Sequence, residues 1–479
     1  MNINIKIVFI ALTTIMLSSC NNWLDISPSD RVTEEEVFTT EKGFHSALNG
    51  IYIQLMTPSL YGATLGCEYV EIMAQRFNLR ATDVDYKKLQ SYDYTTDYSK
   101  KRLQATWEAA YQVILNCNKI IENADVHREV LKGNNYSLVV GEAYALRALM
   151  HFDILRLFGP IYVADQNAKS IPYSDKISVS AGPLLPADTV IQNRIIRDLS
   201  IAENYLKESD PIIANGPMAT SEDDNTFRFR NLRMNYYAVL ALKARVWLYG
   251  ENKTEALKYA KMVIEDPNRE TYFPFTGRIS DGDKNPDRVF STEVLFSLFN
   301  SSRGSIFNNY FNPDNAGKYL LVPKDGMIKE LFQGEEKDYR YYPLWRSTVI
   351  SGENDPNANL TMVCTRYKNV EDTLFYNNLM PMIRLSELYL IAAECDETNN
   401  YTYLNTLRNN RNLTNVSDKI ATRLTAEYTK EFICEGQLFF YYKRKNINKL
   451  KSGSDGNFIN MSATTYVAPF PDSENKYRD

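Results

Sequence analysis

The sequence has few of the residues from which catalytic and metal centres are usually built. Its only histidines, His45, His127 and His151, lie far apart, and its six cysteines include no C-x-x-C pair. The common signatures of zinc proteases, serine hydrolases and nucleotide-binding loops are absent. We therefore expect no enzyme activity, cofactor or metal site, although the 59 acidic residues leave a paired-carboxylate site of the glycosidase type open.

A strong net charge and long apolar runs are also missing. The formal net charge is only −5, so nothing in the composition argues for binding to nucleic acid. Beyond the first 20 residues no run of 18 apolar residues occurs, and we expect no membrane-spanning helix there. The chain of 479 residues is nevertheless long enough to bury a large core.

The N-terminus has the pattern of an export signal. Lys6 precedes an apolar run over residues 7–17, which is too short to span a membrane. The following Leu17-Ser-Ser-Cys20 resembles the lipobox of bacterial lipoproteins, in which the cysteine thiol receives the lipid. We predict a lipoprotein signal peptide over 1–19 and lipidation at Cys20. The alternative is a cysteine that merely ends an ordinary signal peptide.

The strongest helical pattern runs from Glu142 to Phe158. Apolar residues surround it on most sides, which is typical of a helix deep in a large core. Gly159, by adopting a left-handed conformation, and Pro160, by blocking continuation, are suited to end it. We expect its few polar side chains to pair with one another and not to catalyse: Glu142, Arg147, His151, Asp153 and Arg156.

Helical periodicity recurs on both sides of this segment. Residues 235–249 and 254–264 form two closely spaced helices, and their small residues Ala244, Ala256 and Ala260 match a tetratricopeptide pattern. Periodicity fades between 268 and 380, where short apolar runs alternate with turns. The sequence therefore predicts a mainly α fold of tetratricopeptide-like helical repeats with a loop-rich irregular cap.

Tyrosine is abundant, with 33 residues against four tryptophans. A sugar ring stacks on aromatic faces and exchanges hydrogen bonds with Asp, Asn and Arg side chains. Two loop-like segments, 80–98 and 307–312, combine these residue types. We predict a shallow ligand site built from Arg80, Asp83, Tyr92, Tyr94, Tyr310 and Phe311. The alternative is that these rings only pack loops onto the core.

Several phrases along the chain, taken in order, resemble the SusD/RagB family of nutrient-binding outer-membrane lipoproteins. The central helix carries the longest of them, from Glu142 to Gly159. The others are ALNGIY at 47–52, W-x-x-x-Y-x-x-I at 107–114, RLSELYLIAAE at 384–394 and LNTLRNNR at 404–411.

The resemblance implies a function that the residues alone do not. A SusD-like protein would be lipid-anchored in the outer membrane and face the cell exterior. It would bind an oligosaccharide or other nutrient and pass it to a TonB-dependent, SusC-like transporter. The resemblance also implies a single domain over 20–479, with a helical scaffold at about 33–267 and 381–447 and a ligand-side region at about 268–380. Two alternatives stay open: a helical-repeat protein–protein adaptor and a lipid-anchored glycoside hydrolase.

Overall fold

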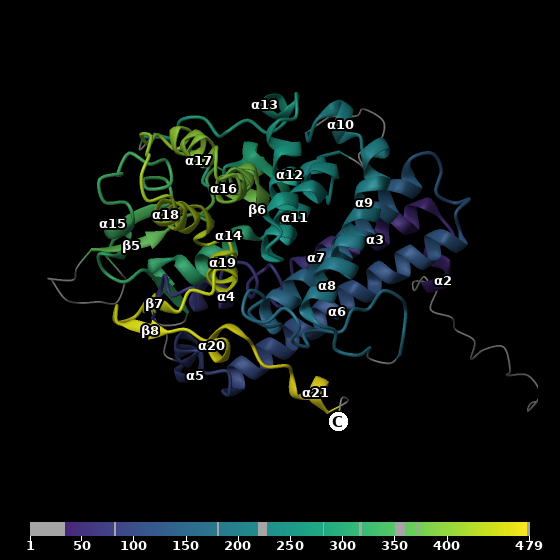
Figure 1. Cartoon of the computed structure of the whole chain (residues 1–479), viewed down its shortest axis with the longest axis horizontal. Helices are drawn as coiled ribbons and strands as arrows, with labels where there is room; N and C mark the ends of the chain where they lie inside the picture. The colour runs from purple at the N-terminus through teal and green to yellow at the C-terminus, as the bar shows by residue number, and fades with distance from the viewer. Residues whose placement is uncertain are drawn as a thin grey trace, which may run out of the picture.

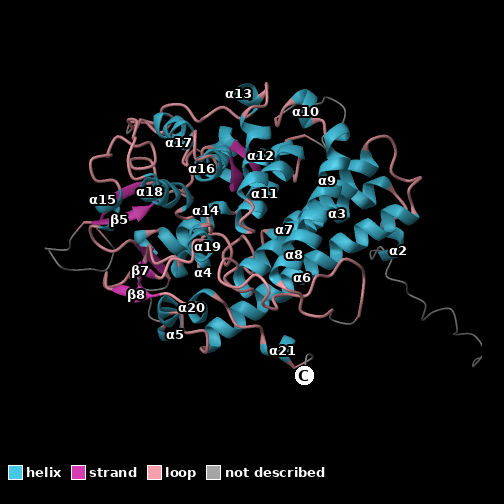
Figure 2. Ribbon diagram, in the orientation of Figure 1, coloured by secondary structure: helices cyan, strands magenta, loops and turns pink. Residues whose placement is uncertain are grey.

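The structure is a computed structural model that describes residues 34–80, 83–179, 182–218, 228–280, 282–315, 319–349, 360–371 and 374–476. The predicted leader and Cys20 lie outside these ranges. Figures 1 and 2 show a body made mostly of helices, with a few short strands at one side, so the predicted mainly α fold is confirmed. Among the described residues, no helix is both long enough and apolar enough to cross a membrane.

Four long helices pack together at one end of the molecule (Figure 1). They are α3 (Glu41–Leu55), α6 (Asp97–Val126), α7 (Asn135–Phe158) and α9 (Ile196–Ser209). The predicted central helix is α7, and it is buried on nearly all sides. It begins at Asn135, seven residues before the predicted start, because buried residues such as Leu138 and Val139 extend its apolar surface. Gly141 lies inside it, and a Cβ there would come within 2.9 Å of Leu206 on α9.

The end of α7 differs from the prediction. Gly159 has a φ of −78° and a ψ of 172°, so it is extended and not left-handed. A distant side chain closes the helix instead: the Lys443 amine donates hydrogen bonds to the carbonyl oxygens of Arg156 and Gly159, each at 2.7 Å. Carbonyls at a helix end need such a partner when they are buried.

The polar residues of α7 pair mainly with other elements. Only Asp153 and Arg156 form an ion pair with each other. Glu142 accepts from Arg230 at 2.5 Å, and Arg147 donates to Asp198 at 2.7 Å. The prediction that these groups are paired is therefore right, but most of the partners lie outside the helix.

His151 is held as a neutral base within this core. Its Nε2 accepts from the Ser174 amide at 3.0 Å, and its Nδ1 lies 2.9 Å from the Arg147 carbonyl oxygen, to which it donates. Burial lowers the pKa of His151 to about 3. The ring also stacks on Tyr173, with centroids 3.8 Å apart. These contacts are structural.

A second group of helices continues the scaffold. Helix α11 (Tyr236–Tyr249) packs on α12 (Lys253–Ile264), which packs on α16 (Leu385–Cys395), which in turn packs on α17 (Asn400–Asn409). Helices α18 (Ile420–Phe432) and α19 (Leu438–Arg444) complete the group. Ala256 and Ala260 are fully buried, as close packing of repeat helices requires. Because α12 and α16 are neighbours, residues 265–384 form an excursion between two consecutive helices of the stack.

Four antiparallel two-stranded sheets are present in the described residues. The pairs are β1 (Asn78–Arg80) with β3 (Leu320–Val322), β2 (Val294–Phe299) with β6 (Leu379–Arg384), β4 (Trp345–Thr348) with β5 (Thr361–Cys364), and β7 (Lys449–Lys451) with β8 (Phe458–Asn460). The short helices are α2 (Glu34–Val37), α4 (Tyr69–Met73), α5 (Val84–Lys88), α8 (Ala187–Val190), α10 (Ile212–Asn215), α13 (Arg269–Tyr272), α14 (Arg303–Ile306), α15 (Met327–Leu331), α20 (Ala463–Tyr466) and α21 (Asp472–Asn475).

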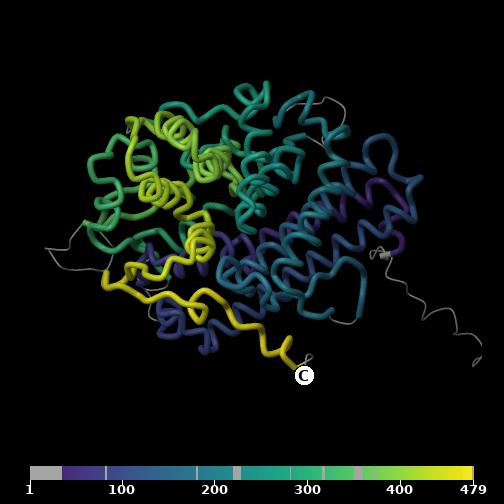
Figure 3. Tube along the Cα trace, in the orientation of Figure 1, coloured from purple at the N-terminus to yellow at the C-terminus, as the bar shows by residue number. Residues whose placement is uncertain are grey.

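The C-terminal segment of the described chain lies against α6 and the residues just before it. Figure 3 shows the C-terminal segment, in yellow, running back along the N-terminal helices. Phe470 packs on Trp107 of α6 with ring centroids 5.4 Å apart, and Tyr94 donates to the Thr465 carbonyl oxygen at 2.6 Å.

Candidate functional site

The β1–β3 pair joins the two aromatic segments that the sequence singled out. Arg80 lies opposite Leu320 in this sheet, and β3 also contacts the short π-helical segment η5 (Phe307–Phe311). The start of α5, the start of α6 and η5 therefore meet around one sheet, although more than 200 residues separate η5 from the other two in the chain.

A tyrosine cluster forms at this meeting point. The ring of Tyr86 on α5 is fully buried, and both Tyr98 and Tyr319 contact it edge-on, with centroids 4.9 and 4.8 Å away. Tyr319 is 38% exposed, while Tyr98 and Tyr310 are partly exposed. Arg102, one turn after Tyr98 on α6, also reaches the surface. We call Tyr98, Arg102, Tyr310 and Tyr319 the tyrosine surface.

A buried carboxylate fixes this surface from below. Glu68 is inaccessible to solvent, and it accepts from the Tyr98 hydroxyl at 2.6 Å and from Arg102 at 3.2 Å. Burial and the Glu68 charge raise the pKa of the Tyr98 phenol, so it stays protonated and donates. Although burial opposes its charge, Glu68 and Tyr98 raise the pKa of Arg102. Arg102 is therefore a permanent cation beside the phenol ring of Tyr98.

A polar pocket adjoins the other side of η5. Its volume is about 440 Å³, and its lining includes Phe307, Asn308 and Asn312 from the second predicted aromatic segment. Its other polar lining residues include Asp314, Arg346, Thr348, Thr365 and Lys368. Amide, hydroxyl and charged groups of this kind exchange hydrogen bonds with the hydroxyls of a sugar.

A larger pocket elsewhere is less suited to such a ligand. It has a volume of about 510 Å³ and lies beside Tyr272 and Phe375. Much of its lining is apolar, including Pro217, Met218 and Pro274. Its lining also offers amides and hydroxyls, but it holds no charged side chain.

Three of the predicted site residues are core residues. Tyr92 and Tyr94 are only 6% and 8% exposed, and Phe311 is fully buried against Phe77. The hydroxyl of Tyr92 donates to the Met73 carbonyl oxygen at 2.7 Å. The expectation that these rings line a shallow surface is wrong, because their faces and hydroxyls serve packing.

The other predicted residues lie near the tyrosine surface. Tyr310 is part of it, and Arg80 pairs with β3 next to Tyr319. Asp83 caps α5 by accepting from the amides of Asp85 and Tyr86, at 2.9 and 3.1 Å. Ligand binding by Arg80, Asp83 and Tyr310 stays a prediction.

The sequence prediction missed Glu68, Arg102 and Tyr319. One signal was available, since Tyr98 and Arg102 are four residues apart on one helix face. Tyr319 gave none, because in the sequence it reads as the start of an apolar run.

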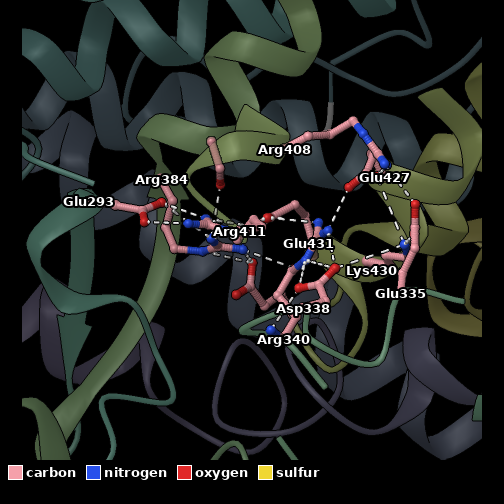
Figure 4. Close-up of polar contacts among 12 residues, drawn as sticks. Glu293, Glu335, Asp338, Arg340, Arg384, Arg408, Arg411, Glu427, Lys430 and Glu431 are labelled. Atoms are coloured by element: carbon pink, nitrogen blue, oxygen red, sulfur yellow. Dashed lines mark hydrogen bonds and ion pairs between the residues drawn. The ribbon is translucent and has the colours of Figure 1, made fainter. Parts of the chain in front are cut away.

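The largest charge cluster is buried and has a different character (Figure 4). Arg340, Arg411 and Glu431 are fully buried, and Glu431 accepts from both arginines, at 3.0 and 2.8 Å. The labelled residues are five cations and five carboxylates: Arg340, Arg384, Arg408, Arg411, Lys430, Glu293, Glu335, Asp338, Glu427 and Glu431. We call them the charge network.

The charge network is scaffolding. Although burial raises it, the pKa of Glu431 is held well below its ordinary value by Arg411, Arg384 and Arg340. The phrases that carry the family resemblance supply Arg384, Arg408 and Arg411, so these positions build the core. Among the described residues, no group of three or more His, Cys, Asp or Glu side chains is placed to hold a metal ion.

Two family models match the chain in succession. The model described as "Starch-binding associating with outer membrane" matches residues 22–210, and the SusD family model matches residues 333–476. Together they cover more than half of the sequence, including the central helix and every residue of the charge network except Glu293. This protein belongs to the SusD/RagB family.

Individual relatives in the family are distant in sequence. SusD-like protein P2 of Formosa agariphila is 26% identical over 204 residues, which is 43% of this chain and 38% of that relative. The match thus spans well under half of the curated relative's length.

Solved structures show that the fold is also shared. A SusD superfamily protein from Bacteroides thetaiotaomicron has a TM-score of 0.69 at 20% identity, covering 91% of this chain and 98% of the other. A SusD-like carbohydrate binding protein from Bacteroides vulgatus has a TM-score of 0.70 at 17% identity, covering 91% and 96%. At such identities the likeness is one of fold, and it confirms the predicted tetratricopeptide-like scaffold.

Proposed function

We propose that this SusD-family protein is a non-catalytic binding protein whose carbohydrate ligand lies on the tyrosine surface and extends into the polar pocket. One observation carries the proposal. Tyr319 is held edge-on against the buried Tyr86 and yet is 38% exposed, and the same Tyr86 ring contacts Tyr98, which lies beside Arg102, whose charge Glu68 fixes. The Bacteroides vulgatus neighbour, described as a carbohydrate binding protein, supports the ligand class.

The chemistry of the two parts is complementary. Partly exposed phenol rings provide faces for the C–H side of a sugar, and Arg102 donates to its hydroxyls. The polar pocket provides amides and hydroxyls for a neighbouring sugar unit. Each stacked ring contributes on the order of 1 kcal/mol, so affinity is weak and spread over several contacts.

The position in the cell follows from the N-terminus and the family. In our proposal, Cys20 carries lipid, the protein faces outward from the outer membrane, and it passes its ligand to a TonB-dependent transporter. The family description of association with the outer membrane supports this placement. Replacing Cys20 with Ala should release the protein from membranes, which fractionation without detergent measures. A variant that still needs detergent for extraction contradicts lipidation at Cys20.

The transporter is tested on the native complex. Stable complexes bury more than about 1,200 Å², so gentle detergent extraction should recover an outer-membrane barrel together with this protein. Extraction that repeatedly yields the protein without a barrel contradicts the transporter partner.

The binding site is tested by calorimetry with oligosaccharides from a glycan screen. Tyr319→Ala should weaken binding about five- to tenfold, because one stacking ring is lost. The melting temperature should change little, since the ring is well exposed.

Tyr401→Ala is the matched control. Tyr401 is also a partly exposed tyrosine, but it lies on α17, on the opposite side of the molecule from α5 (Figure 1). Its removal should leave affinity unchanged. Equal affinities for both variants and the native protein would place the ligand elsewhere, for example in the pocket beside Tyr272.

A further inference from the structure

Two buried cysteines meet where the irregular region contacts the helical scaffold. Cys364 ends β5, and Cys434 lies two residues after α18. Their Sγ atoms are 3.0 Å apart, although 70 residues separate them in the chain. The side chains are 1% and 0% exposed, so the pair is enclosed by protein.

The neighbours of both cysteines are firmly bonded. Arg366 donates to Glu435 at 2.5 Å, which ties the residues after Cys364 to the residue after Cys434. The Tyr367 hydroxyl donates to the Cys434 carbonyl oxygen at 2.6 Å. Cys434 has a φ of 65°, a left-handed conformation that a residue with a Cβ adopts only when its surroundings impose it. The closeness of the thiols is therefore built into the fold.

We propose that Cys364 and Cys434 form a disulfide bond in the mature protein. The two thiols lose two protons and two electrons as one S–S bond forms. The electron acceptor is the disulfide of a thiol–disulfide oxidoreductase, which is reduced to a dithiol. The predicted export signal sends the chain to a compartment where such bonds form and persist. The bond does not depend on the ligand proposed above.

Exchange reactions of this kind begin with a thiolate. Burial opposes ionisation of Cys364, but the hydrogen bond donated by the Cys434 thiol and the Arg366 charge lower its pKa from the ordinary value. Burial and the same hydrogen bond raise the pKa of Cys434. Cys364 is therefore the nucleophile, which attacks the donor disulfide while the chain is still opening and closing. Cys434 then attacks the mixed disulfide and releases the donor as a dithiol.

The bond would close a 70-residue loop that contains β6, α16, α17 and α18. Closing a loop of this length restricts the unfolded chain strongly, so it stabilises the native state. It would fasten β5, in the irregular excursion, to the end of the helix that carries Glu427 and Glu431.

Peptide mapping tests the proposal directly. Trypsin cleaves after Arg346, Arg366, Lys430 and Lys443, so Cys364 falls in peptide 347–366 and Cys434 in peptide 431–443, each with no second cysteine. The full-length protein is purified from cells that export it, and a second sample is incubated with oxidised glutathione. Both are unfolded in iodoacetamide without reductant, digested and analysed by mass spectrometry. We expect a linked 347–366/431–443 pair in both samples. Complete alkylation of both cysteines in both samples would overturn the proposal.

Cys67 provides the control, because it is also fully buried and interacts electrostatically with Cys364. Cys67→Ser should retain the linked pair, while Cys364→Ser should abolish it and leave Cys434 alkylated. A bond from Cys67 to either cysteine in the native protein would contradict the proposal. As a second readout, dithiothreitol should lower the melting temperature of the native protein but not that of Cys364→Ser. Equal shifts in both proteins would count against the bond.

Discussion

The charge network and the tyrosine surface both hold arginine against a buried carboxylate, but they differ in how far the arginine is exposed. In the charge network, Arg411 and Glu431 are fully buried, and their hydrogen bond joins the residues after α17 to α18. Below the tyrosine surface, Glu68 is buried in the same way, but the side chains of Arg102 and Tyr319 are partly exposed to solvent. Exposure of one partner turns a structural ion pair into a site that a ligand can reach.

Breaking the charge network should have the largest effect on stability. Glu431→Ala leaves Arg340, Arg384 and Arg411 buried with one carboxylate fewer, which costs about 3–5 kcal/mol of unfolding free energy. Urea denaturation measures the loss.

The exposed ion pair between Arg423 and Asp418 is the matched control, with side chains 39% and 58% exposed. Arg423→Ala should cost less than about 1 kcal/mol. Similar losses for the two variants would show that the charge network contributes no more than a surface pair.

Glu71, a buried carboxylate outside the charge network, should change the stability of the fold with pH in the direction opposite to that of Glu431. Glu71 accepts from the Gly436 amide at 2.7 Å, but burial dominates and raises its pKa to about 7. Between about pH 4.5 and 7, the folded protein therefore holds a proton that the unfolded chain has released. The unfolding free energy contributed by this group falls as pH rises through that window, by about 3 kcal/mol in total.

Glu71→Gln isolates the contribution of Glu71 to the unfolding free energy, because glutamine keeps the accepting oxygen and does not titrate. The difference between native and variant stability should change by about 3 kcal/mol between pH 4.5 and 8, with the variant favoured at high pH. Glu431 contributes with the opposite sign, since its lowered pKa gives stability that is lost as pH falls below about 4.5. A pH-independent difference between native and Glu71→Gln protein would show that Glu71 has an ordinary pKa.

The smallest expected loss of stability, in Tyr94→Phe, tests the distinction between buried and exposed tyrosine rings. Tyr94→Phe removes the hydrogen bond to the Thr465 carbonyl oxygen and the weaker one to the Met73 sulfur, and should cost about 1 kcal/mol of stability, measured by urea denaturation. Its ligand affinity should equal that of the native protein, whereas Tyr319→Ala should lose affinity and little stability. Loss of binding in Tyr94→Phe would return Tyr94 to the ligand site.

The sequence predicts the helices of this protein far better than its site. The apolar pattern of α7 is local, so its existence and its burial follow from the residues themselves. The role of a tyrosine in a loop is not local: Tyr92 bonds to Met73, and Tyr94 bonds to Thr465, 371 residues away. The side-chain hydrogen-bond partners of Glu142 and Arg147 also lie 28 or more residues away, so their identity depends on the assembled fold.

The bond between Lys443 and the end of α7 bears on how the chain assembles during synthesis. The ribosome releases α7 almost 300 residues before Lys443 appears, so the carbonyls of Arg156 and Gly159 first exist without this donor. Burial and Arg156 hold the pKa of Lys443 well below its ordinary value, so the surrounding helices favour the uncharged amine. The early helices thus present carbonyl acceptors whose donor, Lys443, is synthesised much later. We therefore expect the end of α7 to lack this cap in a nascent chain that ends before Lys443.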